Sequence, residues 1–340
     1  MTTYKLIISG RLEFGRKRSY DKVIQLFEHR YINYYRGDVA FKTEDVFDEE
    51  NLAISIPRLI HQEVSAKRAN NTAKLLEYVA QYAIAGSITL WMIADGDVKK
   101  LYQIEPDSDK VAVQEFLRGR QLVQEAGQET EAMKALNRAI EKFARHASAY
   151  ERRGYVNLKL RNYQDALYDF TKSIDINPRN AESYLGRARV KMLQQKHDEA
   201  ITDLDMAIKY SIPLQPIYWT ARRLKADCHL ELDQPEKAIF ELKLFTKRQF
   251  DPSNPNYAFR KSALTKYGRL LMKTDALPDA IDAFNKAIEI EGGDQTQQGE
   301  QFLYRGIALQ KAGRSGYVKD WKAAANLGSA DAEKLLTEHA

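Results

Sequence analysis

The chain has 340 residues, of which 44% are hydrophobic and 29% are charged. That length allows about two compact domains or one long repeat array, and the composition excludes a wholly disordered chain and a polytopic membrane protein. The formal charge of +5, from 52 basic and 47 acidic residues, is too small for this length to indicate nucleic-acid binding.

Targeting and redox features are sparse. The first residues lack the apolar core of a secretory signal, and no window approaches the roughly 20 apolar residues of a membrane span. The only cysteine, Cys228, excludes an internal disulfide and fits a reducing compartment. We therefore expect a cytoplasmic protein that does not associate with membranes.

Residues 1–108 predict a small α+β domain. The alternation and spacing of apolar residues predict strands at 4–8, 41–47, 52–56, 87–94 and 98–104, with helices at 20–35 and 66–85. Asp95 and Gly96 predict a tight hairpin, because a type I′ turn needs positive φ. This order of elements fits a ferredoxin-like sheet with one added strand.

The N-terminal domain carries no net charge. Residues 1–108 contain 15 basic and 15 acidic side chains, which leaves 37 basic and 32 acidic side chains in the remainder. A neutral domain argues against nucleic-acid binding through the sheet. An apolar helical pattern begins at residue 111, directly after a short polar joint at 106–109, so we expect the two parts to pack together.

Small residues recur periodically beyond residue 108. One set precedes amphipathic runs and is spaced by 34, 34, 38 and 42 residues: Ala132, Ala166, Ala200, Ala238 and Ala280. A second set is spaced by 35, 34, 38, 42 and 38 residues: Gly119, Gly154, Ala188, Ala226, Gly268 and Gly306. Because both sets lengthen at the same places, the repeat is real and its longer steps are loop insertions.

The clearest repeat unit spans residues 147–180. Tyr150, Gly154, Ala166, Phe170 and Pro178 stand at its fourth, eighth, twentieth, twenty-fourth and thirty-second positions. This pattern resembles the tetratricopeptide repeat (TPR), a pair of antiparallel helices in which small residues let the two backbones approach.

The resemblance implies a mostly α protein. Residues 109–340 would form a right-handed superhelical TPR α-solenoid, preceded by the α+β domain at 1–108. Its six units would lie near 112–146, 147–180, 181–214, 219–252, 261–294 and 299–332. Residues 320–332 of the last unit look like the second half of a Sel1-like repeat, which would cap the array.

The resemblance also implies a binding surface, because the first helix of each TPR unit lines a concave groove. The partner-binding candidates there are Arg120, Tyr155, Arg189, Arg223 and Arg269, with Trp219 at the groove edge. Arginine pairs bidentately with carboxylates, so an acidic peptide or a C-terminal carboxylate would suit this wall. The alternative is that the arginines pair internally with neighbouring acids such as Glu182, Asp203, Asp205 and Asp227.

The sequence shows no motif for catalysis, a cofactor or a metal. The six histidines lack His-Glu-x-x-His spacing, and phosphate-loop and dinucleotide-binding motifs are missing. Cys228 and His229 would point about 100° apart on a helix, so a packing role is expected for the cysteine. We predict a non-enzymatic scaffold or adaptor that binds a protein or peptide. The alternative is that residues 1–108 are an enzyme or a small-ligand sensor that the repeats target.

Overall fold

The computed structural model describes residues 3–292 and 294–339. The chain divides into two compact units, Met1–Gly186 and Arg187–Ala340. The division falls inside one helix, α8 (Ala181–Leu193). Each unit is described by itself.

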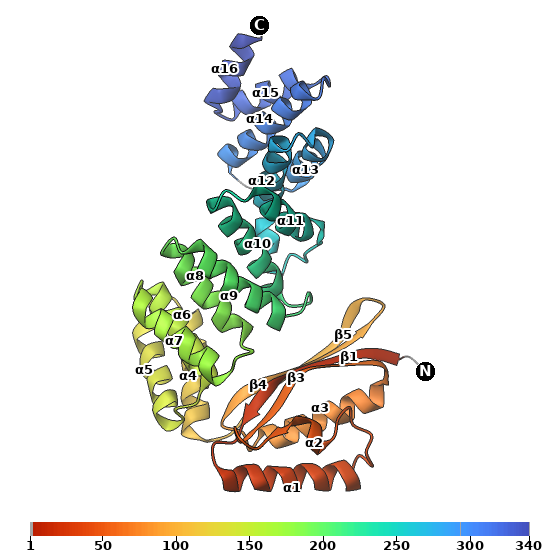
Figure 1. The fold of residues 1–340 in the computed structure, drawn as a ribbon, viewed down its shortest axis with the longest axis vertical. Helices are drawn as coiled ribbons and strands as arrows, with labels where there is room; N and C mark the ends of the chain where they lie inside the picture. The colour runs from red at the N-terminus through yellow and green to blue at the C-terminus, as the bar shows by residue number, and fades with distance from the viewer. Residues whose placement is uncertain (1–2, 293, 340) are drawn as a thin grey trace. The chain divides into compact units, whose positions relative to one another are not determined.

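The first unit begins with a five-stranded antiparallel sheet (Figure 1). Its strands are β1 (Thr3–Glu13), β2 (Phe47–Asp48), β3 (Ala53–Ser65), β4 (Ala85–Ala94) and β5 (Asp97–Ile104). They lie in the order β2-β3-β1-β4-β5, and every neighbouring pair is antiparallel. This is the order of a ferredoxin-like sheet with β5 added beside β4, which confirms the predicted topology.

Two helices, α1 (Lys17–Asn33) and α3 (Ala66–Ala80), pack on the sheet. Alternate residues of β1, Leu6, Ile8 and Leu12, enter the core together with Phe27 of α1 and Leu75 of α3. The period of two in β1 and the helical spacing in α1 and α3 therefore meet in one apolar core.

One predicted strand is wrong. The first part of the expected strand at 41–47 is loop and a short helix, α2 (Thr43–Val46), and only Phe47 enters a strand. The backbone N–H of Lys42 donates to Asp45 Oδ2 at 2.8 Å, so a local side-chain cap satisfies a donor that a strand would have used.

The strand predicted at 52–56 is instead thirteen residues long and continues through Pro57 to Ser65. Ile8 lies opposite Leu59 and Gly10 lies opposite Ile56, so β3 carries one extra residue where the proline stands. A β-bulge is a position at which a strand tolerates proline, because no ladder hydrogen bond is required of it there. The predicted hairpin turn is confirmed, with φ of +55° at Asp95 and +82° at Gly96.

Helical hairpins complete the first unit. They comprise α4 (Val111–Gln124) with α5 (Glu129–Lys142), and α6 (Ala147–Lys159) with α7 (Tyr163–Ile176). A methyl group on Gly119 would lie 2.8 Å from the Leu136 side chain, and one on Gly154 would lie 2.9 Å from the Phe170 ring. The small residues that set the repeat period are therefore the points of closest approach between paired helices.

The sheet and the first hairpins belong to the same compact unit, as the apolar helical pattern from residue 111 predicts. Lys110 Nζ donates to the backbone oxygens of Tyr82 and Ala83 at 2.6 and 3.0 Å. Arg145 also donates to the side chain of Asn51 at 2.8 Å.

The second unit continues the series of helices. After the rest of α8 come α9 (His197–Tyr210), α10 (Pro216–Glu231), α11 (Pro235–Lys247), α12 (Arg260–Lys273), α13 (Leu277–Glu289), α14 (Gln295–Lys311), α15 (Tyr317–Asn326) and α16 (Ala330–Glu338). The long connection before α12 contains a 3₁₀ turn at Tyr257–Phe259 and produces the longest step of the repeat. Ala332 of α16 packs with Trp321 of α15, whereas a Sel1-like cap stays a prediction.

Candidate functional site

Paired helices are joined by buried ion pairs that were not predicted from the sequence. The basic partner lies on the first helix, directly before its small residue, as Arg153 lies before Gly154. The acidic partner lies on the second helix, three residues after the position that Ala166 occupies in the clearest repeat unit. The N–O distances are 2.6 Å for Arg153–Asp169, 2.7 Å for Arg187–Asp203, 3.1 Å for Lys225–Glu241 and 2.7 Å for Arg305–Asp320. All four carboxylates are buried.

Each of these pairs holds a carboxylate in the protein interior, where an unpaired charge would destabilise the fold. Burial raises the pKa of Asp169, and the hydrogen bonds that it accepts from Arg153 and Asn157 oppose that rise. A buried pair adds little net stability, but losing one partner typically costs about 3–5 kcal/mol. Arginines in this position are therefore structural and are not available to a ligand.

Two hairpins lack this pair. At the matching positions, α4 and α5 have Arg118 and Ala135, whereas α12 and α13 have Tyr267 and Ala283. The α12–α13 hairpin therefore has an aromatic ring and a methyl group where its neighbours hold a base and an acid.

Two of the predicted groove residues of the first unit have partners within that unit. Arg120 Nη1 lies 2.8 Å from both carboxylate oxygens of Glu105. The hydroxyl of Tyr155 donates to the backbone oxygen of Glu182 at 3.0 Å, and its ring packs edge-on against Phe170 with centroids 5.0 Å apart.

Arg269 and Trp219 of the second unit also have partners. Arg269 Nη1 lies 2.6 Å from Glu300 Oε1, and both side chains are well exposed. Trp219 Nε1 donates to the backbone oxygen of Pro213 at 2.8 Å, and its ring contacts Phe250 with centroids 5.8 Å apart. Trp219 is only partly buried, so one part of the indole remains accessible.

Arg189 and Arg223 differ from the other predicted groove residues in how weakly they are paired. They lie on the first helices α8 and α10, within the second unit. Among residues 3–292 and 294–339, the side chain of Arg189 has no hydrogen bond or ion pair. Burial lowers the pKa of Arg223, and the positive charge of Arg189 lowers it further.

Arg223 is only weakly neutralised. Its Nη1 is 3.7 Å from Asp227 Oδ2, while Asp227 accepts a 2.6 Å hydrogen bond from Lys266. Its guanidinium lies over the ring of Phe259, with Cζ 3.9 Å from the centroid. Its Nε is buried and has no hydrogen-bond partner in the described part of the chain.

Two of the acids named as an alternative are paired internally, through cations other than the predicted arginines. Asp203 pairs with Arg187 and Lys191, and Asp205 pairs with Lys225. The spacing of the repeats alone could not distinguish the arginines that pair internally from those that do not. The signal that separates them is position, since the paired bases directly precede the small residue of their helix.

Cys228 is fully buried, and burial raises the pKa of its thiol to about 12, with Asp227 and Glu231 adding to that rise. The prediction of a packing cysteine is confirmed. Across the described residues, no cluster of three metal-binding side chains occurs, and no helix combines the length and apolar character needed to cross a bilayer.

Comparison with known proteins agrees with the hairpin geometry. A family model described as tetratricopeptide repeat matches residues 121–181 and 185–244. No curated protein matches the sequence.

Two solved structures are similar to this chain. YrrB, described as a TPR protein with an unusual peptide-binding site, aligns with a TM-score of 0.50 and 17% identity over 61% of this chain and 100% of its own. PilF from Pseudomonas aeruginosa aligns with a TM-score of 0.53 and 16% identity over 68% of this chain and 98% of its own. At these identities the likeness concerns the fold. Together with the repeat match and the helix-pair contacts, it shows that the helical region of this chain has the fold of a tetratricopeptide-repeat solenoid and that a small α+β domain precedes it.

Proposed function

We propose that this chain is a non-enzymatic adaptor of the cytoplasm that holds a segment of a partner protein on the face formed by the first helices of its hairpins. The partner segment carries an acidic side chain or a free C-terminal carboxylate. Arg189 and Arg223 receive that carboxylate.

The observation that carries this proposal is the uncompensated charge of these two arginines. The half-buried arginines that directly precede the small residue of their helix have carboxylate partners, as Arg153 and Arg187 do. Arg189 has none among the described residues, and Arg223 has one distant contact. A carboxylate between them would relieve the repulsion of two like charges and would use the fork geometry of guanidinium groups.

The aromatic ring beneath Arg223 also supports carboxylate binding at this position. Stacking on Phe259 fixes the plane of the guanidinium, so less side-chain entropy is lost when a carboxylate binds. The likeness to YrrB, a TPR protein with a peptide-binding site, fits this type of partner.

The test is affinity capture with the full-length chain, followed by identification of the bound proteins. Arg189→Glu/Arg223→Glu is the test variant, and Lys311→Glu/Arg314→Glu is the control, because it makes the same change in charge at exposed positions of the same unit. We expect partners that bind the wild type and the control but not the test variant. Equal recovery by all three proteins would show that the arginine pair is not the binding site.

A further inference from the structure

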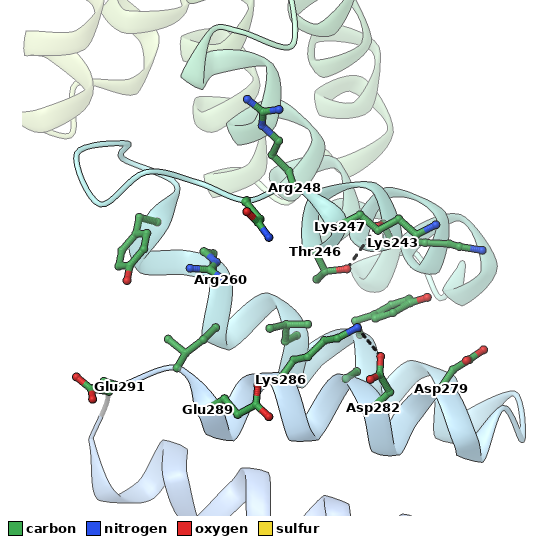
Figure 2. A pocket seen from close by; sticks show the side chains of 16 residues that line it. Lys243, Thr246, Lys247, Arg248, Arg260, Asp279, Asp282, Lys286, Glu289 and Glu291 are labelled. Carbon is green, nitrogen blue, oxygen red and sulfur yellow. Dashed lines mark hydrogen bonds and ion pairs between the residues drawn. The ribbon is translucent and has the colours of Figure 1, made fainter. Parts of the chain in front are cut away.

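A second surface of the solenoid lies on the second helices of the hairpins. A cleft of about 960 Å³ opens between α11 and α13. It is lined by Lys243 and residues 246–249 at and just beyond the end of α11, by Tyr257, Arg260, Leu264 and Tyr267, and by residues of α13 and its C-terminal end. Figure 2 shows Lys243, Lys247 and Arg248 coming from one side of this cleft and Asp279, Glu289 and Glu291 from the other. We refer to it as the α11–α13 cleft.

The origin of the cleft lies in the sequence. Two of its lining residues, Tyr267 and Ala283, occupy the positions where neighbouring hairpins hold a buried base and acid. The long connection between α11 and α12 supplies three more lining residues, Arg248, Gln249 and Tyr257. A missing ion pair and an insertion therefore coincide at this cleft.

One wall of the cleft is basic. Lys243 and Lys247 are exposed on α11, Arg248 follows directly, and Arg260 stands at the start of α12. None of these four cations makes an ion pair with another described residue. Arg260 instead lies near the ring of Tyr257, with Cζ 5.2 Å from its centroid.

The facing wall is acidic. Asp279, Asp282 and Glu289 project from α13, and Glu291 follows two residues after its end. Asp282 pairs with Lys286 at 2.6 Å, whereas the other three carboxylates have no ion pair within the described chain. The floor between the two walls is less polar and contains Leu264, Tyr267 and Ile290.

We propose that the α11–α13 cleft is a docking site for a peptide segment of mixed charge, separate from the arginine pair. The segment presents acidic side chains to α11, basic side chains to α13 and an apolar side chain to Tyr267. Both a helix and an extended strand present side chains on two opposite edges, which is the arrangement that two facing walls of opposite charge require.

Other ligand classes fit less well. A polyanion such as nucleic acid would gain from the basic wall but would be repelled by Asp279, Glu289 and Glu291 on the other. A small metabolite fits less well because the sites that enclose such ligands are mostly apolar, whereas charged side chains form both walls of this cleft. Tyrosine in a cleft floor is typical of protein interfaces.

The experiment is selection from a random dodecapeptide display library on immobilised full-length protein. Lys243→Glu/Lys247→Glu reverses the charge of the basic wall, and peptides that depend on the cleft are those whose enrichment falls about tenfold or more on this variant. We expect these peptides to contain both acidic and basic residues and to lose affinity as salt is raised.

Two further variants keep the result interpretable. Asp279→Lys/Glu289→Lys makes both walls basic, so it should select peptides that are acidic throughout. Arg189→Glu/Arg223→Glu should keep every cleft-dependent peptide, because the arginine pair is a different site. All of the substituted residues of the cleft are exposed, so circular dichroism should show unchanged folding.

The proposal is overturned if no peptide depends on Lys243 and Lys247. It is also overturned if the dependent peptides selected on the wild type contain acidic but no basic residues, or if they are lost equally on Arg189→Glu/Arg223→Glu. The last result would leave the adaptor proposal standing and remove only the second site. Loss of acidic peptides on the arginine variant, with cleft-dependent peptides unchanged, would support both sites.

Discussion

His146 makes the first unit sensitive to acid. It is 1% exposed and stands at the start of α6, where its Nδ1 accepts a hydrogen bond from the backbone N–H of Ala149 at 3.2 Å. Its ring packs on Phe116 with centroids 4.6 Å apart. Because Nδ1 accepts, the neutral ring carries its proton on Nε2, and a second proton would have to displace the cap of α6.

Burial lowers the pKa of His146 from its ordinary value of 6.5 to about 3. The folded chain therefore keeps the ring neutral, whereas the unfolded chain binds a proton as the pH falls below 6.5. Stability from this residue is complete above pH 6.5 and declines until the pH reaches about 3. At pH 5.0 the loss is about 2 kcal/mol, from 1.5 pH units at about 1.4 kcal/mol each.

The comparison that isolates this effect is His146→Asn. Asparagine does not titrate, and its side-chain oxygen can accept the same N-cap hydrogen bond. The variant loses ring packing, so we expect it to be less stable than the wild type at pH 7.5. Its deficit should shrink by about 2 kcal/mol at pH 5.0, because only the wild type is penalised by protonation.

The assay is urea-dependent hydrogen–deuterium exchange, followed by mass spectrometry of peptides from residues 111–160. This readout reports the first hairpins directly and does not require the whole chain to unfold in one step. A deficit that stays constant between pH 7.5 and 5.0 would refute the reasoning. So would a direct NMR titration of His146 with a midpoint near 6.5.

Three further predictions follow from packing and burial. Asp320→Ala should cost about 3–5 kcal/mol in chemical denaturation because it leaves Arg305 without its carboxylate, and Arg305→Met/Asp320→Leu should cost clearly less; equal costs would contradict the pairing argument. Gly306→Ala should lose about 1–3 kcal/mol, since its methyl group would lie 2.5 Å from an indole ring, whereas Gly299→Ala in the same helix has room and should gain about 0.5–1 kcal/mol. Cys228, with its raised pKa of about 12, should resist alkylation by iodoacetamide in the native chain and react only in denaturant; fast native labelling would show that the thiol is accessible.

Periodic features were predictable because they follow from steric contact between helices. The small residues at 154 and 268 mark the closest approach to Phe170 and Phe284, and a contact repeated in every hairpin leaves a repeated mark in the sequence. The turn at Asp95 was predictable for a similar reason, since few residues adopt positive φ.

Features that depend on local competition were not predictable. The apolar residues around Phe41 and Phe47 suit a strand as well as a helix, and the short helix between them is capped by a hydrogen bond from the backbone N–H of Lys42 to the Asp45 side chain. The boundary between an N-terminal domain and the solenoid at residue 108 stays a prediction, because the compact units divide elsewhere.

The candidate site was predictable only as a set of helix positions. Arg120 and Arg189 occupy equivalent positions in their repeats, yet Glu105 neutralises the first and no described residue neutralises the second. Which arginine stays uncompensated depends on acids from distant parts of the sequence. A repeat pattern carries no information about such partners.

The ion pairs between paired helices also bear on how such an array can change in length. Each pair closes within a single hairpin, as in Arg305 with Asp320. Duplicating or deleting a whole hairpin therefore moves both charges together and never leaves one of them buried alone. A solenoid built in this way can gain or lose repeats by recombination at the connecting loops, with a polar interior that remains balanced at every length.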